Sequence, residues 1–157
     1  MQLIIKNMTE KYAVEVLCWK YEKPYDYYNN VLTSGAILEL VSYRYYVMLN
    51  EHSKIVGYFC IGKPARVPSD HFKEAYKEDC IDIGIGMNPA LTGKGFGKVF
   101  FQKILEFVEE KYEKDIRLTV ALFNKRAIHL YEAFQFKEGV RFTRDDVEFM
   151  TMIKRRM

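Results

Sequence analysis

Several segments of the chain place hydrophobic residues at helical spacing. Tyr12 and Val16 follow Thr9 in this way, and Thr9 can cap a helix that begins at Glu10. From Gly95 onward, apolar residues occupy one face of a helix of about four turns. The predicted helices are residues 10–23, which Pro24 ends, Tyr25–Leu32, the segment from Gly95 to Tyr112, and Lys125–Phe134, capped by Asn124.

Other segments alternate apolar with small or polar residues, as strands do. Cys80–Met87 carries an apolar side chain at every second position and is ended by Pro89, while Gly84 and Gly86 mark a bulge or a close backbone approach. The other predicted strands are Leu3–Lys6, Tyr43–Leu49, Lys54–Ile61, Ile116–Leu122, Phe136–Phe142 and Val147–Ile153. Residues 62–79 are expected to form a loop. The pattern predicts an α/β domain with a mixed sheet and about four helices.

Composition narrows the class of protein. The chain has 157 residues, of which 49% are hydrophobic and 29% charged, so we expect one packed domain over residues 1–157. A net charge of only +3 excludes a dedicated polyanion binder, and the basic tail Lys154–Arg156 is expected to be a solvated terminus. The sequence has no membrane-length apolar run, and its start lacks the features of a signal peptide. We therefore expect a cytoplasmic protein with neither nucleic acid nor membrane as partner.

Cysteine and histidine give no sign of a metal site or a disulfide framework. The three cysteines are odd in number and lie in separate apolar stretches, which predicts buried free thiols: Cys18, Cys60 and Cys80. The histidines show no ligand spacing with each other or with cysteine: His52, His71 and His129. We predict that the protein holds no metal.

Five of the nine glycines fall within fourteen residues: Gly84, Gly86, Gly93, Gly95 and Gly97. The last three lie where a strand ends and a helix begins. Backbone N–H groups at a helix start favour an anion, and Lys94 and Lys98 add positive charge, so a phosphate or pyrophosphate site is expected. A tight turn without a ligand is the alternative. The spacing fits neither a Walker A loop nor a Rossmann fingerprint.

The glycine loop resembles the coenzyme A loop of the GCN5-related N-acetyltransferase (GNAT) family, which has the pattern Gln/Arg-x-x-Gly-x-Gly/Ala. Here the matching residues are Thr92-Gly93-Lys94-Gly95-Phe96-Gly97, with Thr92 in place of the usual Gln or Arg. Downstream, Asn124 and Tyr131 match the family's Asn and Tyr in type and spacing. Gln135 replaces the family's usual Gly. The two motifs and the strand order extend the resemblance over roughly residues 43–140.

This resemblance implies a single GNAT-like acyl-CoA N-acyltransferase domain that transfers the acetyl group of acetyl-CoA to a primary amine of a small molecule or peptide. In the family the pantetheine arm pairs with the strand before the loop. The implied cofactor-binding residues are Ile85, Gly86, Met87, Thr92, Gly93, Lys94, Gly95, Phe96, Gly97, Lys98, Asn124 and Tyr131. A non-catalytic acyl-CoA-binding or regulatory domain is the alternative, and the family also includes many homodimers.

The resemblance also suggests catalytic roles. Tyr131 is the candidate general acid for the leaving sulfur, and the N–H of Met87 is the candidate donor to the developing oxyanion. Asp82 and Glu22 are candidate bases; Asp79, Glu148 or water are further options. The aromatic segment after the first helix corresponds to the acceptor side of the fold, which implicates Trp19, Tyr21, Tyr25 and Tyr28. These aromatic residues could equally pad the helices against the sheet.

Overall fold

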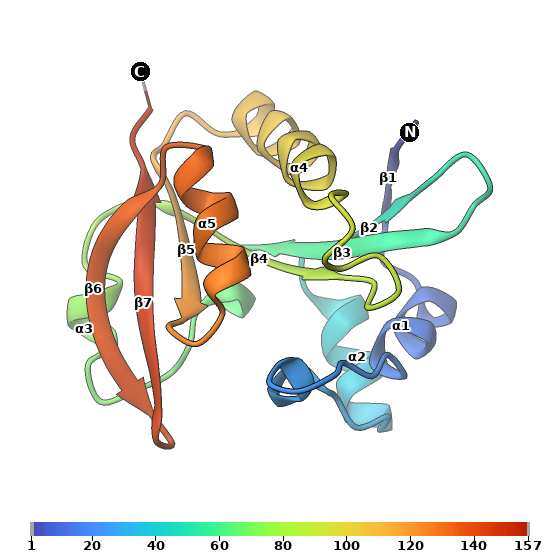
Figure 1. The fold of residues 1–157 in the computed structure, drawn as a ribbon, viewed down its shortest axis with the longest axis horizontal. Coiled ribbons are helices and arrows are strands. Elements are labelled where there is room, and N and C mark those ends of the chain that lie inside the picture. Colours follow the sequence, from blue (N-terminus) through green and yellow to red (C-terminus); the bar gives the residue numbers. More distant parts are fainter. Residues whose placement is uncertain (1, 157) are drawn as a thin grey trace. The chain divides into compact units, whose positions relative to one another are not determined.

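The computed structural model describes residues 2–156, which contain seven strands and five α-helices. The strands form a sheet in the order β1-β2-β3-β4-β5-β7-β6, in which β4 and β5 run parallel. The pairs β1–β2, β2–β3, β5–β7 and β6–β7 are antiparallel. The strands are β1 Ile4–Asn7, β2 Tyr45–Leu49, β3 Ile55–Ile61, β4 Ile81–Met87, β5 Ile116–Ala121, β6 Lys137–Arg144 and β7 Val147–Lys154 (Figure 1). The predicted mixed α/β fold is confirmed.

The helices are α1 Glu10–Leu17, α2 Ser34–Ser42, α3 Phe72–Ala75, α4 Gly97–Lys111 and α5 Lys125–Ala133. Two short 3-10 helices cover Tyr25–Tyr28 and Lys63–Ala65. Side-chain caps start α1 and α5 as predicted, because Thr9 accepts from the Tyr12 N–H and Asn124 accepts from the Ala127 N–H.

The chain divides into two compact units. Unit 1 holds the chain up to Cys60 together with Ile85–Glu106, and unit 2 holds Ile61–Gly84 together with the chain from Phe107 onward. Both β4 and α4 therefore continue from one unit into the other. The single-domain prediction stays a prediction.

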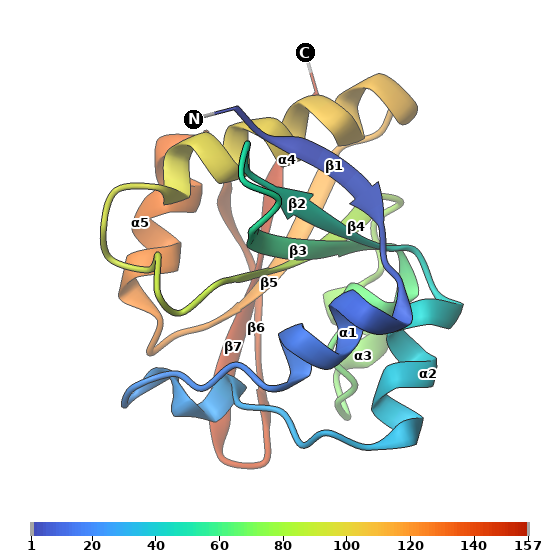
Figure 2. The same ribbon diagram turned by 90° about the vertical axis from the view of Figure 1, so that its right-hand side faces the viewer.

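Unit 1 is built on β1, β2 and β3, with α1 and α2 beside one another on these strands (Figure 2). Apolar side chains of α1, α2, β2 and β3, together with Met8 directly after β1, make its core. The buried members are Met8, Ala13, Val16, Leu17, Leu40, Val47, Leu49 and Ile55. Helix α2 was not predicted; the sequence placed a helix at Tyr25–Leu32 instead, where only the short 3-10 helix forms.

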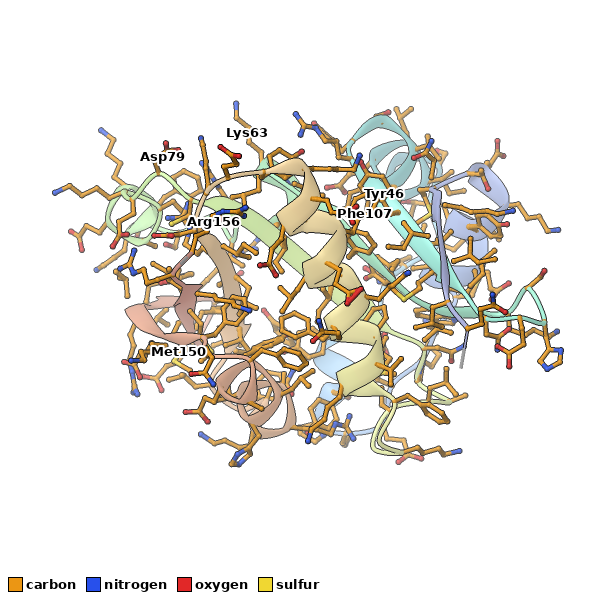
Figure 3. All side chains as sticks on the ribbon, turned by 90° about the horizontal axis from the view of Figure 1, so that it is seen from above. Tyr46, Lys63, Asp79, Phe107, Met150 and Arg156 are labelled. Carbon is orange, nitrogen blue, oxygen red and sulfur yellow. The ribbon has the colours of Figure 1, made fainter. Side chains whose placement is uncertain are left out.

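Unit 2 is built on β5, β7 and β6, with α3 packed near β6 (Figure 1). One cluster of its core contains Ala75, Tyr76, Ala121, Phe142 and Phe149. The arginines of the basic tail are exposed, as expected of a solvated terminus, but they also bond to acidic residues of this unit. The Arg155 guanidinium pairs with Glu78 at 2.6 Å, and the Arg156 N–H donates to Asp115 at 2.8 Å. Figure 3 labels Arg156 on this unit.

Candidate active site

The end of β4 and the start of the glycine loop are fixed by Asn88. The Asn88 N–H donates to the Val56 carbonyl at 2.9 Å, and its side-chain Nδ2 donates to the Ile55 carbonyl at 2.9 Å. The remaining side-chain oxygen accepts from the Ala90 N–H at 2.9 Å. Three hydrogen bonds of one residue thus set the direction in which the chain leaves the sheet. The sequence analysis did not assign this role, although Asn-Pro at the end of a strand is a turn signal.

The loop itself needs its glycines for conformational reasons. Gly93 and Gly95 have φ values of 72° and 84°, in the left-handed region that glycine adopts without strain. A Cβ on Gly95 would meet no atom within 4 Å, so the space beside this residue is open. Thr92, which stands where the family usually has Gln or Arg, donates its hydroxyl proton to the Pro89 carbonyl at 2.9 Å. Thr92 therefore stabilises the turn.

The first turn of α4 presents free donors. The first backbone hydrogen bond of the helix runs from the Phe100 N–H to the Phe96 carbonyl at 3.1 Å. Within the described residues, the N–H groups from Gly97 to Val99 precede that bond and have no recorded acceptor. Lys94 and Lys98 are exposed beside them. This end of α4 is electrostatically suited to bind an anion.

Along β4, the backbone N–H and C=O groups of successive residues point to opposite edges of the strand. Because the Asn88 N–H points toward β3, the N–H and C=O of Met87 point toward the opposite edge, as do those of Ile85. The Met87 carbonyl accepts a hydrogen bond at 2.7 Å from the Tyr21 hydroxyl. Met87 therefore presents its N–H, the candidate oxyanion donor, on the same edge as the Tyr21 hydroxyl.

The close approach predicted around Gly86 is present on the β3 side. A Cβ on Gly86 would overlap the Tyr58 ring, and a Cβ on Gly57 would lie 2.8 Å from the Gly86 carbonyl oxygen. Side chains at these two positions would push β3 and β4 apart. Glycine at residue 86 is therefore required by the packing of Tyr58.

The side chains of the aromatic segment lie in different places: one packs in the core, and another reaches the edge of β4. Trp19 packs against the core of unit 1, with its ring centroid 6.0 Å from that of Tyr58. Tyr21 instead reaches the end of β4, whereas Tyr25 and Tyr28 lie in the 3-10 helix. Burial raises the pKa of the Tyr21 phenol, to which Tyr58 also contributes. Burial likewise raises the pKa of Tyr58 to about 12, so both phenols are protonated at neutral pH.

Asp82 is buried in a network of charges. It accepts from the Arg117 Nε at 2.7 Å and from the Arg66 Nε at 2.8 Å. Asp82 and Arg117 are 2% and 0% exposed. Both carboxylate oxygens are engaged by cations, which gives Asp82 a structural role and makes it a poorer candidate for the general base than the sequence suggested.

The other candidate bases are solvent-exposed. Glu22 is exposed next to Tyr21, and Glu148 is exposed on β7. Asp79 is 82% exposed and pairs with Lys114 at 2.8 Å. Among these three, Glu22 alone neighbours a residue that contacts the end of β4.

Helix α5 carries the second predicted motif, in unit 2. Asn124 caps the helix, and Tyr131 is buried, with its ring centroid 6.2 Å from that of Phe136. The helix ends in a Schellman motif, since the N–H groups of Gln135 and Phe136 donate to the carbonyls of Glu132 and Tyr131. Gln135 has a φ of 74°, the conformation for which the family's glycine is suited.

The cysteine prediction is correct for two of the three thiols. Cys60 and Cys80 are buried and form no disulfide, whereas Cys18 is exposed at the end of α1. Over residues 2–156, no cluster of three or more His, Cys, Asp or Glu residues is arranged to hold a metal ion. In the same range no helix is both long enough and apolar enough to cross a membrane.

Comparisons with known proteins show the family of the chain and its fold. The model of the acetyltransferase (GNAT) family matches residues 8–136. A search of curated protein sequences found no significant match.

Among solved structures, an aminoglycoside acetyltransferase in complex with coenzyme A and kanamycin superimposes with a TM-score of 0.76 at 17% identity, covering 99% of this chain and 95% of that one. A spermidine N-acetyltransferase from Vibrio cholerae, in complex with CoA and spermine, superimposes with a TM-score of 0.69 at 17% identity, covering 98% and 95%.

Proposed function

The chain belongs to the acetyltransferase (GNAT) family, and from this premise we propose that it is an acetyl-CoA-dependent N-acetyltransferase acting on a primary amine. The observation that carries the proposal is the glycine loop. Its two left-handed glycines and the free N–H groups of the first turn of α4 form a suitable cradle for a pyrophosphate. Lys94 and Lys98 contribute the positive charge that such a dianion requires.

The residues of the loop fit coenzyme A by their chemistry. The open space beside Gly95 lets a phosphate approach the backbone closely, and most of the contacts would come from backbone amides, which the Thr92 replacement leaves intact. The outward-facing backbone of Ile85 and Met87 is suited to pair with the amide groups of pantetheine. Asn124 and Tyr131 of α5 are inferred to contact the cofactor by the family resemblance.

Acetyl-CoA supplies an activated acetyl group: the amine nitrogen forms a bond to the carbonyl carbon, the C–S bond breaks, and the sulfur leaves as a thiol. The Met87 N–H is proposed to stabilise the negative charge on the carbonyl oxygen. Tyr131 is proposed to donate a proton to the sulfur. The amine proton passes to Glu22 or to water.

The acceptor is proposed to be a small-molecule or peptide amine. The two solved structures above were determined with spermine and with kanamycin, both polyamines in the chemical sense, so these compounds are the first probes to try. A short peptide with a free N-terminus represents the other class.

The proposal is tested with the purified protein, acetyl-CoA and this set of amines, with the release of free CoA thiol as the readout. Calorimetric titration with CoA measures binding independently of turnover. We expect CoA binding and thiol release with at least one amine. CoA binding without turnover on any amine would instead favour a regulatory acyl-CoA-binding domain, and no CoA binding would refute both functions.

A further inference from the structure

The hydroxyl of Tyr21 joins two parts of unit 1 that are 66 residues apart in sequence. It donates to the Met87 carbonyl at 2.7 Å, at the last residue of β4. The contact lies on the strand edge that faces away from β3. Tyr21 takes no part in the proposed proton transfers or in binding the carbonyl oxygen.

Tyr21 sits in a loop that is closed by its own hydrogen bonds. The Tyr21 N–H donates to the Asn29 side-chain oxygen at 2.7 Å, and the Lys20 ammonium donates to the Asn30 carbonyl at 3.1 Å. These two bonds hold the ends of residues 20–30 together, as in a compact surface loop. The backbone at Tyr21 is therefore held in place, and the side chain extends from it to β4.

The peptide group between Met87 and Asn88 is held from both sides. Its N–H donates to Val56 on β3, and its carbonyl accepts from Tyr21 on the other edge. Two opposed hydrogen bonds restrict rotation of this peptide about the strand axis. Because it shares the Met87 Cα with the preceding peptide, the direction of the Met87 N–H is restricted as well.

We propose that Tyr21 is a positioning residue for acetyl transfer, whose hydroxyl holds the Met87 peptide so that the Met87 N–H keeps its direction toward the reacting carbonyl oxygen. The inference rests on the proposed function, because that function assigns the Met87 N–H. Burial keeps the Tyr21 hydroxyl protonated, as its raised pKa indicates, so it acts as a donor and not as a base. It also ties the loop 20–30 to the strand end.

The test compares Tyr21→Phe with Tyr43→Phe. Tyr43 also belongs to unit 1, but its side chain is exposed and its hydroxyl has no hydrogen-bond partner among residues 2–156, so it controls for the loss of a phenol. For Tyr21→Phe we expect kcat to fall about tenfold with unchanged CoA affinity, because one oriented hydrogen bond is lost in the transition state. Tyr43→Phe should behave as the wild type.

An infrared measurement gives a second readout that needs no acceptor. Acetyl-CoA labelled with ¹³C at the thioester carbonyl should show a lowered C=O stretching frequency when bound to the wild type, since the Met87 N–H donates to it. In Tyr21→Phe the frequency should return toward the value in solution. A merely structural role of Tyr21 would lower the melting temperature without moving this band.

The outcomes separate the two proposals. The positioning role would be overturned if Tyr21→Phe kept the wild-type kcat and if its bound acetyl-CoA kept the C=O frequency seen in the wild type. If the wild type binds acetyl-CoA but acetylates no amine, the proposed activity fails. The infrared comparison alone then tests whether Tyr21 positions the Met87 N–H. If the wild type does not bind acetyl-CoA, both proposals fail.

Discussion

At the scale of single residues, the buried carboxylate of Asp82 balances two guanidinium groups. Asp82→Asn keeps the shape of the side chain but removes the charge that compensates the buried Arg117. We expect the free energy of unfolding, measured by urea denaturation, to fall by about 3 kcal/mol. Asp79→Asn is the matched control, because its pair with Lys114 is exposed and should be worth less than about 1 kcal/mol. Equal losses in the two variants would contradict this role.

The activity of the same variant, Asp82→Asn, distinguishes a structural role of Asp82 from a role as the general base. Loss of a general base lowers kcat by roughly 10²–10⁴. We expect less than about a tenfold change in folded Asp82→Asn, because its carboxylate oxygens are already engaged by cations.

Tyr131 tests the assignment of the general acid. Tyr131→Phe keeps the buried ring and removes only the hydroxyl, so we expect kcat to fall about 100-fold while acetyl-CoA binding stays within a factor of about two. Turnover is followed by thiol release and binding by calorimetry. Unchanged turnover would remove Tyr131 from this role.

Gln135 carries backbone strain at the end of α5. A non-glycine residue with a φ of 74° is disfavoured, and the residue is exposed, so its side chain does little to compensate. Gln135→Gly should raise the free energy of unfolding by about 0.5–1 kcal/mol, measured by thermal or urea denaturation. Gln135→Ala retains the strain and serves as the control. Equal stability of the two variants would show that the conformation is not strained.

At the scale of elements, the glycine loop and an unrelated turn offer a matched comparison. Gly95 and Gly62 both have positive φ, 84° and 93°, and a Cβ on either would meet no atom within 4 Å. Alanine should therefore strain the backbone at both positions, by about 1–2 kcal/mol or more. Only Gly95→Ala should weaken CoA binding, by about tenfold or more, because its methyl group occupies the space proposed for the pyrophosphate.

Calorimetric titration of both variants with CoA decides this point. Equally weakened CoA binding in Gly95→Ala and Gly62→Ala would show that backbone strain alone lowers the affinity. Wild-type affinity in Gly95→Ala would place the cofactor away from this loop.

The elements could be predicted where a local signal was strong. The cap residues Thr9 and Asn124 start their helices as expected, and the alternating apolar residues of β4 form a strand. Helix α2 escaped prediction because its apolar side chains do not all face the core: Leu38 is 63% exposed and Val41 is 41% exposed. A pattern analysis that assigns apolar residues to one buried face cannot place such a helix.

At the scale of the whole molecule, the family could be predicted from short motifs, whereas the long-range contacts could not. The bond between Tyr21 and Met87 joins residues 66 apart, and the Asp82–Arg117 pair joins residues 35 apart. Nothing in the sequence near Asp82 indicates that an arginine will be buried beside it, because charged residues are usually exposed. Only the pairing of β4 with β5, which sets Asp82 opposite Arg117, brings the two together.

From the buried tyrosines of both units we predict that the protein loses stability at alkaline pH. Burial raises the pKa of Tyr58 to about 12, and it raises the pKa values of Tyr21, Tyr45 and Tyr76 as well. In the unfolded chain these phenols lose their protons near pH 10, while in the folded protein they keep them. The folded state thus binds more protons above pH 10, and stability must fall as the pH rises from about 10 toward 12.

Spectrophotometric titration of tyrosine at 295 nm, together with circular dichroism, measures this directly. The phenols of Tyr21, Tyr45, Tyr58 and Tyr76 should ionise only at the pH where the circular dichroism signal is lost, above the pH at which a free phenol ionises. The two events must coincide, because burial both raises these pKa values and depends on the fold. Ionisation of all twelve tyrosines in one step near pH 10, with the fold intact, would mean that Tyr21, Tyr45 and Tyr58 of unit 1 are open to water. Tyr21 could then no longer hold the Met87 edge of β4 through a protonated hydroxyl.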